Sequence, residues 1–218
     1  MIARVLSMGG WKIFSWIVVF NVLILIASQI VLIDEIVFFN TYSEQLTYER
    51  SMELFDTMRS YSWVTYAMTP ILLLLKFSVL SVLLYVGVFF SDLTKEITLG
   101  KIFKVVVMCE IVFVVASVIK LLWFVFFAGN YTLEDLSYFY PLSLINLFSR
   151  SEVASYWVYP LQILNVFQVL YALLLAIGLS TTGLVRKSTA DRVVLLTYFP
   201  AIVVWVATIM FLTIDAMP

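Results

Sequence analysis

The sequence lacks histidine altogether and has a single cysteine, Cys109. Without histidine the chain cannot form a Ser-His-Asp or Cys-His catalytic group, and it loses a principal zinc ligand. One cysteine allows no disulfide within the chain. Charged residues are scarce as well, at 12% against roughly 25% in soluble domains. These absences predict no cofactor and no metal site.

The chain is correspondingly rich in apolar residues. They make up 63% of the chain, against roughly 45–50% in soluble domains, which is more apolar surface than a water-soluble fold can bury. The stretches between the apolar runs are too short for an independent core, so we expect one membrane domain over 1–218. The net charge of −1 argues against a nucleic-acid partner.

Five apolar runs have the length of membrane spans, which is roughly 20 residues each. Because lipid offers no hydrogen-bond partners, such spans are expected to be helices. The sequence therefore predicts an all-α polytopic bundle of five transmembrane helices, with the first run kept as an uncleaved anchor. The predicted spans are 13–33, 69–90, 104–128, 161–184 and 193–214.

The basic residues are divided unequally between the two sides of these spans. One side carries Arg4, Lys12, Lys95, Lys101, Lys104, Arg186, Lys187 and Arg192, and the other carries Arg50, Arg59 and Arg150. Since cytoplasmic loops are rich in lysine and arginine, the N-terminus is expected in the cytoplasm and the C-terminus outside.

The outer segments contain patterns of their own. In 44–63 large residues recur at helical spacing opposite acids, which predicts an amphipathic helix, and Thr132-x-x-Asp135 predicts a capped short helix in 129–160. We expect short interfacial helices on the outer side. They are interpreted either as a belt at the headgroup level or as a docking surface for another protein.

Three ionisable residues lie inside the spans: Lys76, Glu110 and Lys120. Each costs roughly 2.5–3.5 kcal/mol at mid-bilayer, so each needs a local explanation. Three explanations stay open. The lysines could reach back to the outer headgroups, Lys76 could pair with Glu110, or a cavity open to the outside could attract an anionic headgroup or substrate.

The fourth span adds Gln162, Asn165 and Gln168, spaced to share one side of a helix and to extend the polar zone of the outer half. They could make interhelical hydrogen bonds or belong to a site. The same span carries small residues at Ala172, Ala176 and Ser180. This small-residue face predicts close helix packing, within the chain or against a partner.

Residues 65–214 resemble the Yip (Ypt-interacting protein) family. The resemblance rests on the runs at 140–144, 164–167 and 173–179, on Thr182-Gly183, and on a last apolar helix near the C-terminus. It implies five spans with a cytoplasmic N-terminus and no catalytic residues. Only residues 1–12 precede the first span, so the likeness is to prokaryotic-type relatives, which implies the bacterial inner membrane with a periplasmic C-terminus.

Two functions are compatible with these patterns. The first is a non-enzymatic scaffold, assembly or accessory subunit of a larger complex, with membrane lipids and other integral membrane proteins as partners. The second is a small transporter or lipid-handling protein that uses an outer polar cavity around Lys76, Lys120 and Gln168. An enzyme is not expected, because no span contains an aspartate and Glu110 has no acidic partner.

Overall fold

The computed structural model describes residues 9–43, 45–91, 98–181 and 185–215. Within these ranges the chain is helical and contains no strand, which confirms the predicted all-α class. The elements in chain order are α2 (Gly10–Leu32), α3 (Glu35–Tyr42), α4 (Tyr48–Ser60), α5 (Ser62–Phe89), α6 (Leu99–Cys109), α7 (Ile111–Phe126), α8 (Leu133–Tyr138), the 3-10 helices η1 (Leu144–Leu147) and η2 (Arg150–Glu152), α9 (Ser155–Ile163), α10 (Val166–Thr181) and α11 (Lys187–Asp215).

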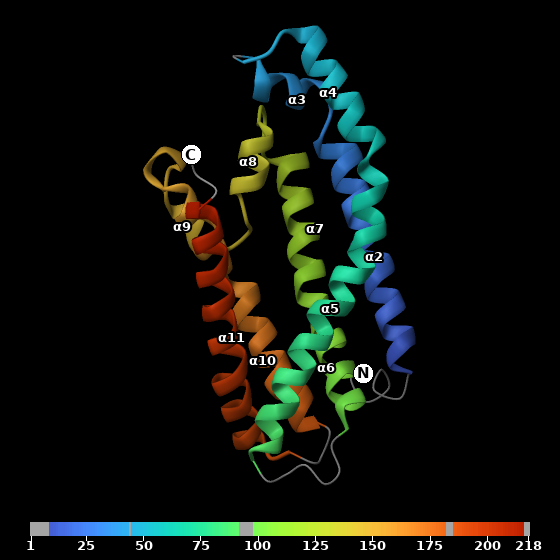
Figure 1. Cartoon of the computed structure of the whole chain (residues 1–218), viewed down its shortest axis with the longest axis vertical. Helices are drawn as coiled ribbons and strands as arrows, with labels where there is room; N and C mark the ends of the chain where they lie inside the picture. The colour runs from blue at the N-terminus through green and yellow to red at the C-terminus, as the bar shows by residue number, and fades with distance from the viewer. Residues whose placement is uncertain (1–8, 44, 92–97, 182–184, 216–218) are drawn as a thin grey trace.

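Four apolar helices are long enough to cross a membrane, namely α2, α5, α6 continued by α7, and α11. Their mean hydropathies lie between 2.3 and 2.6. They run along the long axis of the molecule, and α2 begins at the end opposite to the one where α11 ends (Figure 1). This architecture indicates an integral membrane protein.

The helix formed by α6 and α7 is the most deeply packed of the four. In its most apolar stretch 44% of the residues are buried, against 11–28% in the other three helices. Its valines at 105–107 meet buried residues of α5 and α10, among them Phe77, Leu84 and Leu175. Because lipid tails are as apolar as these side chains, close packing rather than escape from water holds this core together.

A second, smaller core lies at one end of the bundle, where α3, α4 and α8 gather (Figure 1). Leu32, Val37, Phe124 and Leu136 are its buried residues. Asp34 begins α3 by accepting a hydrogen bond from the Val37 N–H at 2.7 Å. The predicted cap of α8 is confirmed, because Thr132 and Asp135 form a reciprocal capping box.

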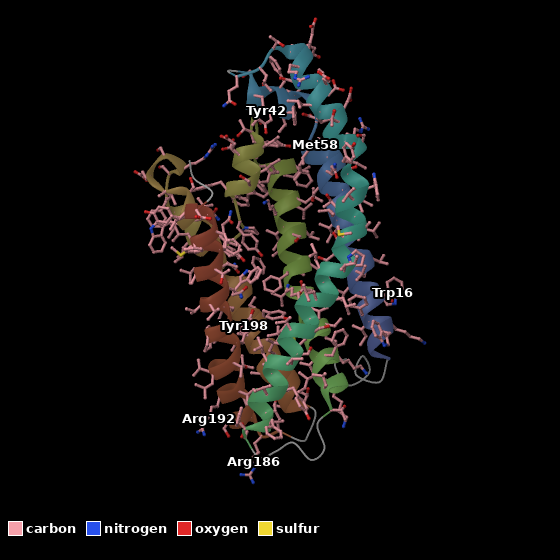
Figure 2. The ribbon with its side chains drawn as sticks, in the orientation of Figure 1. Trp16, Tyr42, Met58, Arg186, Arg192 and Tyr198 are labelled. Atoms are coloured by element: carbon pink, nitrogen blue, oxygen red, sulfur yellow. The ribbon has the colours of Figure 1, made fainter. Side chains whose placement is uncertain are left out.

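The basic side chains Arg186 and Arg192 lie at the opposite end from Tyr42 and Met58 (Figure 2). The polar end segments and the basic end are thus separated by the length of the bundle. Arg4 and Lys95, which also entered the prediction of orientation, lie outside the described residues.

The prediction of one continuous helix over 161–184 is wrong. The chain forms α9, leaves helical geometry at Leu164 and Asn165, and continues as α10, an apolar helix of 16 residues. Residues 182–184 lie outside the described part. The apolar run gave no sign of this break, because the break is held by backbone hydrogen bonds to a distant loop.

Candidate functional site

The first candidate site is an ion pair at the junction of α6 and α7. Glu110 connects the two helices, and its N–H donates to the Val107 carbonyl at 3.3 Å, a tighter turn than an α-helix makes. Lys76 Nζ, on α5, donates to both carboxylate oxygens of Glu110, at 2.7 and 2.9 Å. Of the three explanations open for Lys76, the structure shows the pairing with Glu110.

The two partners of this pair differ sharply in burial. The Glu110 side chain is 3% exposed, whereas 44% of the Lys76 side chain is exposed on the flank of α5. Lys76 Nζ also lies 4.7 Å from the centre of the Phe113 ring and 6.0 Å from that of Tyr171. A cation over ring faces gains further stabilisation where water is excluded. Lys76 therefore neutralises an interior carboxylate from the surface of the bundle.

Two tyrosines extend this polar region toward α11. Gln168 Nε2 donates to the Tyr198 hydroxyl at 2.8 Å, and the rings of Tyr198 and Tyr171 are 5.5 Å apart. Tyr171 is fully buried, and its hydroxyl has no hydrogen-bond partner among the described residues. Sequence reasoning missed both tyrosines, because a single tyrosine in an apolar helix looks like any other core or interface aromatic.

The predicted polar face of the fourth span does not exist as one face. Asn165 lies in the break, where its Oδ1 accepts the Gln168 N–H at 2.8 Å and so caps the start of α10. The Leu144 N–H donates to the Leu164 carbonyl and the Val166 N–H to the Leu142 carbonyl, at 3.0 and 3.1 Å. Because a membrane interior supplies no other partners, these bonds to the loop let the helix stop there.

Lys120 and Gln162 hold α8 rather than line a common site with Lys76. Lys120 Nζ donates to the Leu136 carbonyl at 2.7 Å. Gln162 Nε2 donates to the carbonyls of Ser137 and Tyr138, both at 2.7 Å. These three carbonyls belong to the C-terminal end of α8, where acceptors lack helical partners and positive charge is favourable. The ammonium group of Lys120 is thus bound by a backbone carbonyl oxygen of the protein.

The predicted small-residue face is partly buried inside the bundle. Ala172 and Ala176 are buried, while Ser180 is half-buried and donates to the Ile177 carbonyl within its own helix. A closer approach occurs at Gly178, where an added Cβ would lie 2.4 Å from Val105 Cγ1 of α6. Likewise a Cβ at Gly87 of α5 would lie 2.5 Å from Thr197 Cγ2 of α11. Both glycines were missed, since helical spacing alone does not say which face a glycine occupies.

Two cavities adjoin α2, one between α2, α4 and α5 and the other between α2, α7 and α8. The outer cavity, of about 400 Å³, includes Gln29, Asp34, Arg59 and Tyr66 in its lining. The deeper cavity, of about 320 Å³, has a mixed lining. Apolar residues of α2 such as Ile24 and Leu25 line it together with Asn21, Ser28, Thr69, Ser117 and Lys120. Lys76 and Gln168 line neither of these two cavities.

The arrangement offers charge pairing, amphipathic cavities and close helix contacts. In the described ranges no three acidic or cysteine side chains gather in a way that could hold a metal ion. Comparisons with protein-family models, with curated proteins and with solved structures give no match for this chain.

Proposed function

We propose that this chain is a non-enzymatic integral membrane protein that serves as a scaffold, assembly or accessory subunit of a larger membrane complex. The observation that supports this most is the exposure of Lys76. A charged side chain within a span is costly where it faces lipid, and pairing with Glu110 offsets only part of that cost. A polar group of a neighbouring membrane protein, packed on the flank of α5, would cover the rest.

The proposed topology has five crossings. The fifth crossing would consist of α10 together with the break and α9. By helical rise α10 alone spans about 24 Å, short of the roughly 30 Å of hydrocarbon. The break, filled by the loop at 140–147, would supply the remaining depth as non-helical backbone enclosed in protein. In this arrangement α3, α4, α8 and α9 would be interfacial elements on the outer side.

The proposed orientation places the N-terminus in the cytoplasm and the C-terminus in the periplasm of a bacterial inner membrane. It follows from the excess of lysine and arginine at or just before the N-terminal ends of α2, α6 and α11. The same topology is implied by the resemblance to the Yip family, which we retain as a proposal. Lipids and other integral membrane proteins would be its partners.

The subunit role is tested by purifying the tagged chain in mild detergent, with size-exclusion chromatography and mass spectrometry of co-eluting proteins. We expect stoichiometric membrane partners. The double variant Lys76→Met with Glu110→Gln removes both charges of the pair at once, so that no buried charge is left unpaired. It should lose a partner whose polar group contacts Lys76 on α5. Trp16→Leu, at an exposed position on α2, is the matched control and should retain it. Elution as a lone monomer or homo-oligomer would contradict the subunit role.

A second function, lipid handling or small-molecule transport, is favoured by the deeper cavity at Lys120. Its amphipathic lining suits an acyl chain with a polar end. The site would include fewer residues than the polar zone expected from the sequence. Lys76 would not belong to it, because it pairs with Glu110, and Gln168 would not, because it binds Tyr198. Transport activity of the purified chain in vesicles, abolished by Lys120→Met in protein that still folds, would support it.

A further inference from the structure

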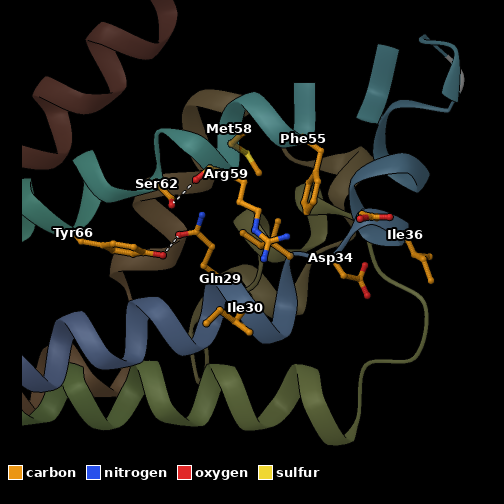
Figure 3. A pocket seen from close by; sticks show the side chains of 11 residues that line it. Gln29, Ile30, Asp34, Ile36, Phe55, Met58, Arg59, Ser62 and Tyr66 are labelled. Carbon is orange, nitrogen blue, oxygen red and sulfur yellow. Dashed lines mark hydrogen bonds between the residues drawn. The ribbon is translucent and has the colours of Figure 1, made fainter. Parts of the chain in front are cut away.

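The outer cavity contains an arginine, Arg59, that has no partner among the residues that the structure describes. Of the arginines of the outer segments, Arg50 pairs with Glu53 and Arg150 with Glu134. The Arg59 guanidinium has no ion pair or hydrogen bond within the described residues, although Asp34 and Glu35 line the same cavity. Figure 3 shows the Arg59 side chain extending from α4 toward α2, while the Asp34 carboxylate points away from it. Cationic and anionic groups therefore face the cavity separately.

Hydrogen-bond donors accompany this cation. Tyr66 OH donates to Gln29 Oε1 at 2.5 Å, which leaves the Gln29 amide nitrogen with donors for a ligand (Figure 3). A guanidinium with a neighbouring amide donor matches the oxygens of a phosphate group. The carboxylates of Asp34 and Glu35, on the α3 side, match an ammonium group. One ligand that satisfies both sets has a phosphate ester joined to an amine.

The apolar part of the lining indicates where such a ligand comes from. Ile30, Ile33 and Met58 line the outer cavity beside Arg59 and Ser62. Ser62 begins α5, and the exposed Trp63 follows it. Ile33 also lines the deeper cavity, which continues along α2 to Asn21. Ile33 thus belongs to the lining of both spaces. The outer one is nearer the end of the bundle, and the deeper one combines apolar residues of α2 with polar groups that include Lys120.

We propose that the two cavities together bind one phospholipid with a phosphoethanolamine headgroup. Its phosphate lies on Arg59 and Gln29, its ammonium on Glu35 and Asp34, and one acyl chain passes Ile33 into the deeper cavity. This assignment specifies the ligand of the lipid-handling alternative and is independent of the subunit role. If the purified chain binds the lipid but does not transport it, the proposed binding site would be supported and the transport function would be contradicted.

The test is a titration of the delipidated full-length chain in detergent, with bound lipid counted by native mass spectrometry. The probes are phosphatidylethanolamine, phosphatidylglycerol and phosphatidylcholine. We expect phosphatidylethanolamine to bind most tightly, because only its headgroup combines a phosphate with an ammonium that donates hydrogen bonds. Equal binding of phosphatidylglycerol, which has no amine, would overturn the assignment of the carboxylates.

The headgroup contacts are tested by three variants. Arg59→Gln removes the cation and should weaken phosphatidylethanolamine binding about tenfold. Arg50→Gln, on the same helix but outside the cavity, is the matched control and should bind like the unaltered chain. Glu35→Gln should reduce the preference for phosphatidylethanolamine over phosphatidylglycerol about twofold to fivefold. Unchanged binding by Arg59→Gln would overturn the site.

The source of the ligand is settled by competition with glycerophosphoethanolamine, which has the same headgroup without acyl chains. We expect it to compete weakly. Ser28→Leu, which fills the deeper cavity, should weaken lipid binding while leaving the affinity of the soluble compound itself unchanged. Equal competition by the soluble compound would contradict a lipid ligand. The thermal unfolding temperature of every variant distinguishes a lost contact from a lost fold.

Discussion

Lys76 and Glu110 meet through both carboxylate oxygens, at 2.7 and 2.9 Å, although they lie on different helices. The carboxylate is interior and the ammonium is at the surface of the bundle, so the two halves of the pair are not equivalent. Loss of the lysine strands a buried charge, whereas loss of the glutamate leaves a lysine whose side chain is partly exposed and is not confined to the interior.

The asymmetry predicts unequal mutant stabilities. Lys76→Met should destabilise the protein by about 3 kcal/mol, because it leaves Glu110 unpaired in the interior. Glu110→Gln should cost less, and the double variant should recover part of the loss of Lys76→Met. Unfolding in detergent, followed by tryptophan fluorescence, measures the difference. Equal costs for the two single variants would show that Glu110 is not confined as the structure describes.

The glycine contacts predict which small residues set the helix spacing. Gly178→Ala places a methyl group against Val105 and should destabilise the protein by about 1–3 kcal/mol, with partial rescue by Val105→Ala. Gly100→Ala is the matched control, because a Cβ there meets nothing within 4 Å. It should be neutral or slightly stabilising, since alanine favours helix. The same unfolding measurement applies, and a cost at Gly100 equal to that at Gly178 would argue against the α6–α10 contact.

The cap in the break predicts an effect of Asn165. Asn165→Leu removes the acceptor for the Gln168 N–H and should cost about 1 kcal/mol, within the usual range for lost N-caps. Asn165→Asp keeps that acceptor and should retain part of the stability. Hydrogen exchange of the first turn of α10 reports the loss directly. Slow exchange in Asn165→Leu, unchanged from the parent chain, would contradict the capping role.

The contact between Lys120 and α8 predicts a local effect. Lys120→Met should raise amide exchange in residues 133–138, because the C-terminal carbonyls of α8 lose a cationic donor. Ser117→Ala, on the same helix and beside the same cavity, should leave exchange in α8 unchanged. If both variants exchange like the unaltered chain, Lys120 does not anchor α8.

The proposed orientation predicts labelling from opposite sides. In a Cys109→Ala background, Thr47→Cys before α4 should react in intact cells with a membrane-impermeant maleimide, and Lys187→Cys at the start of α11 should react only after lysis. The positive-inside bias is the physical reason. The reverse pattern would invert the topology.

Several features could be predicted because they depend on local chemistry alone. Helical class follows from long apolar runs, and the Thr132 cap follows from a four-residue spacing that satisfies its own backbone donors. The break at Asn165 could not be predicted, since the loop at Leu142 and Leu144, 20 or more residues earlier, supplies its backbone partners. Nothing in the run itself distinguishes a residue that continues a helix from one that ends it.

The sequence by itself determined that this chain is helical and apolar enough to enter a membrane, because composition and run length govern transfer into lipid. It also placed Lys76, Glu110 and Lys120 inside apolar spans, where a charged side chain needs a partner. Only the tertiary structure decided that Glu110 pairs with Lys76, that Lys120 binds a carbonyl of α8, and that Arg59 has no such partner among the described residues. Those outcomes depend on which helix faces cross and how closely. Between α10 and α6, for example, the contact of Gly178 with Val105 sets that distance.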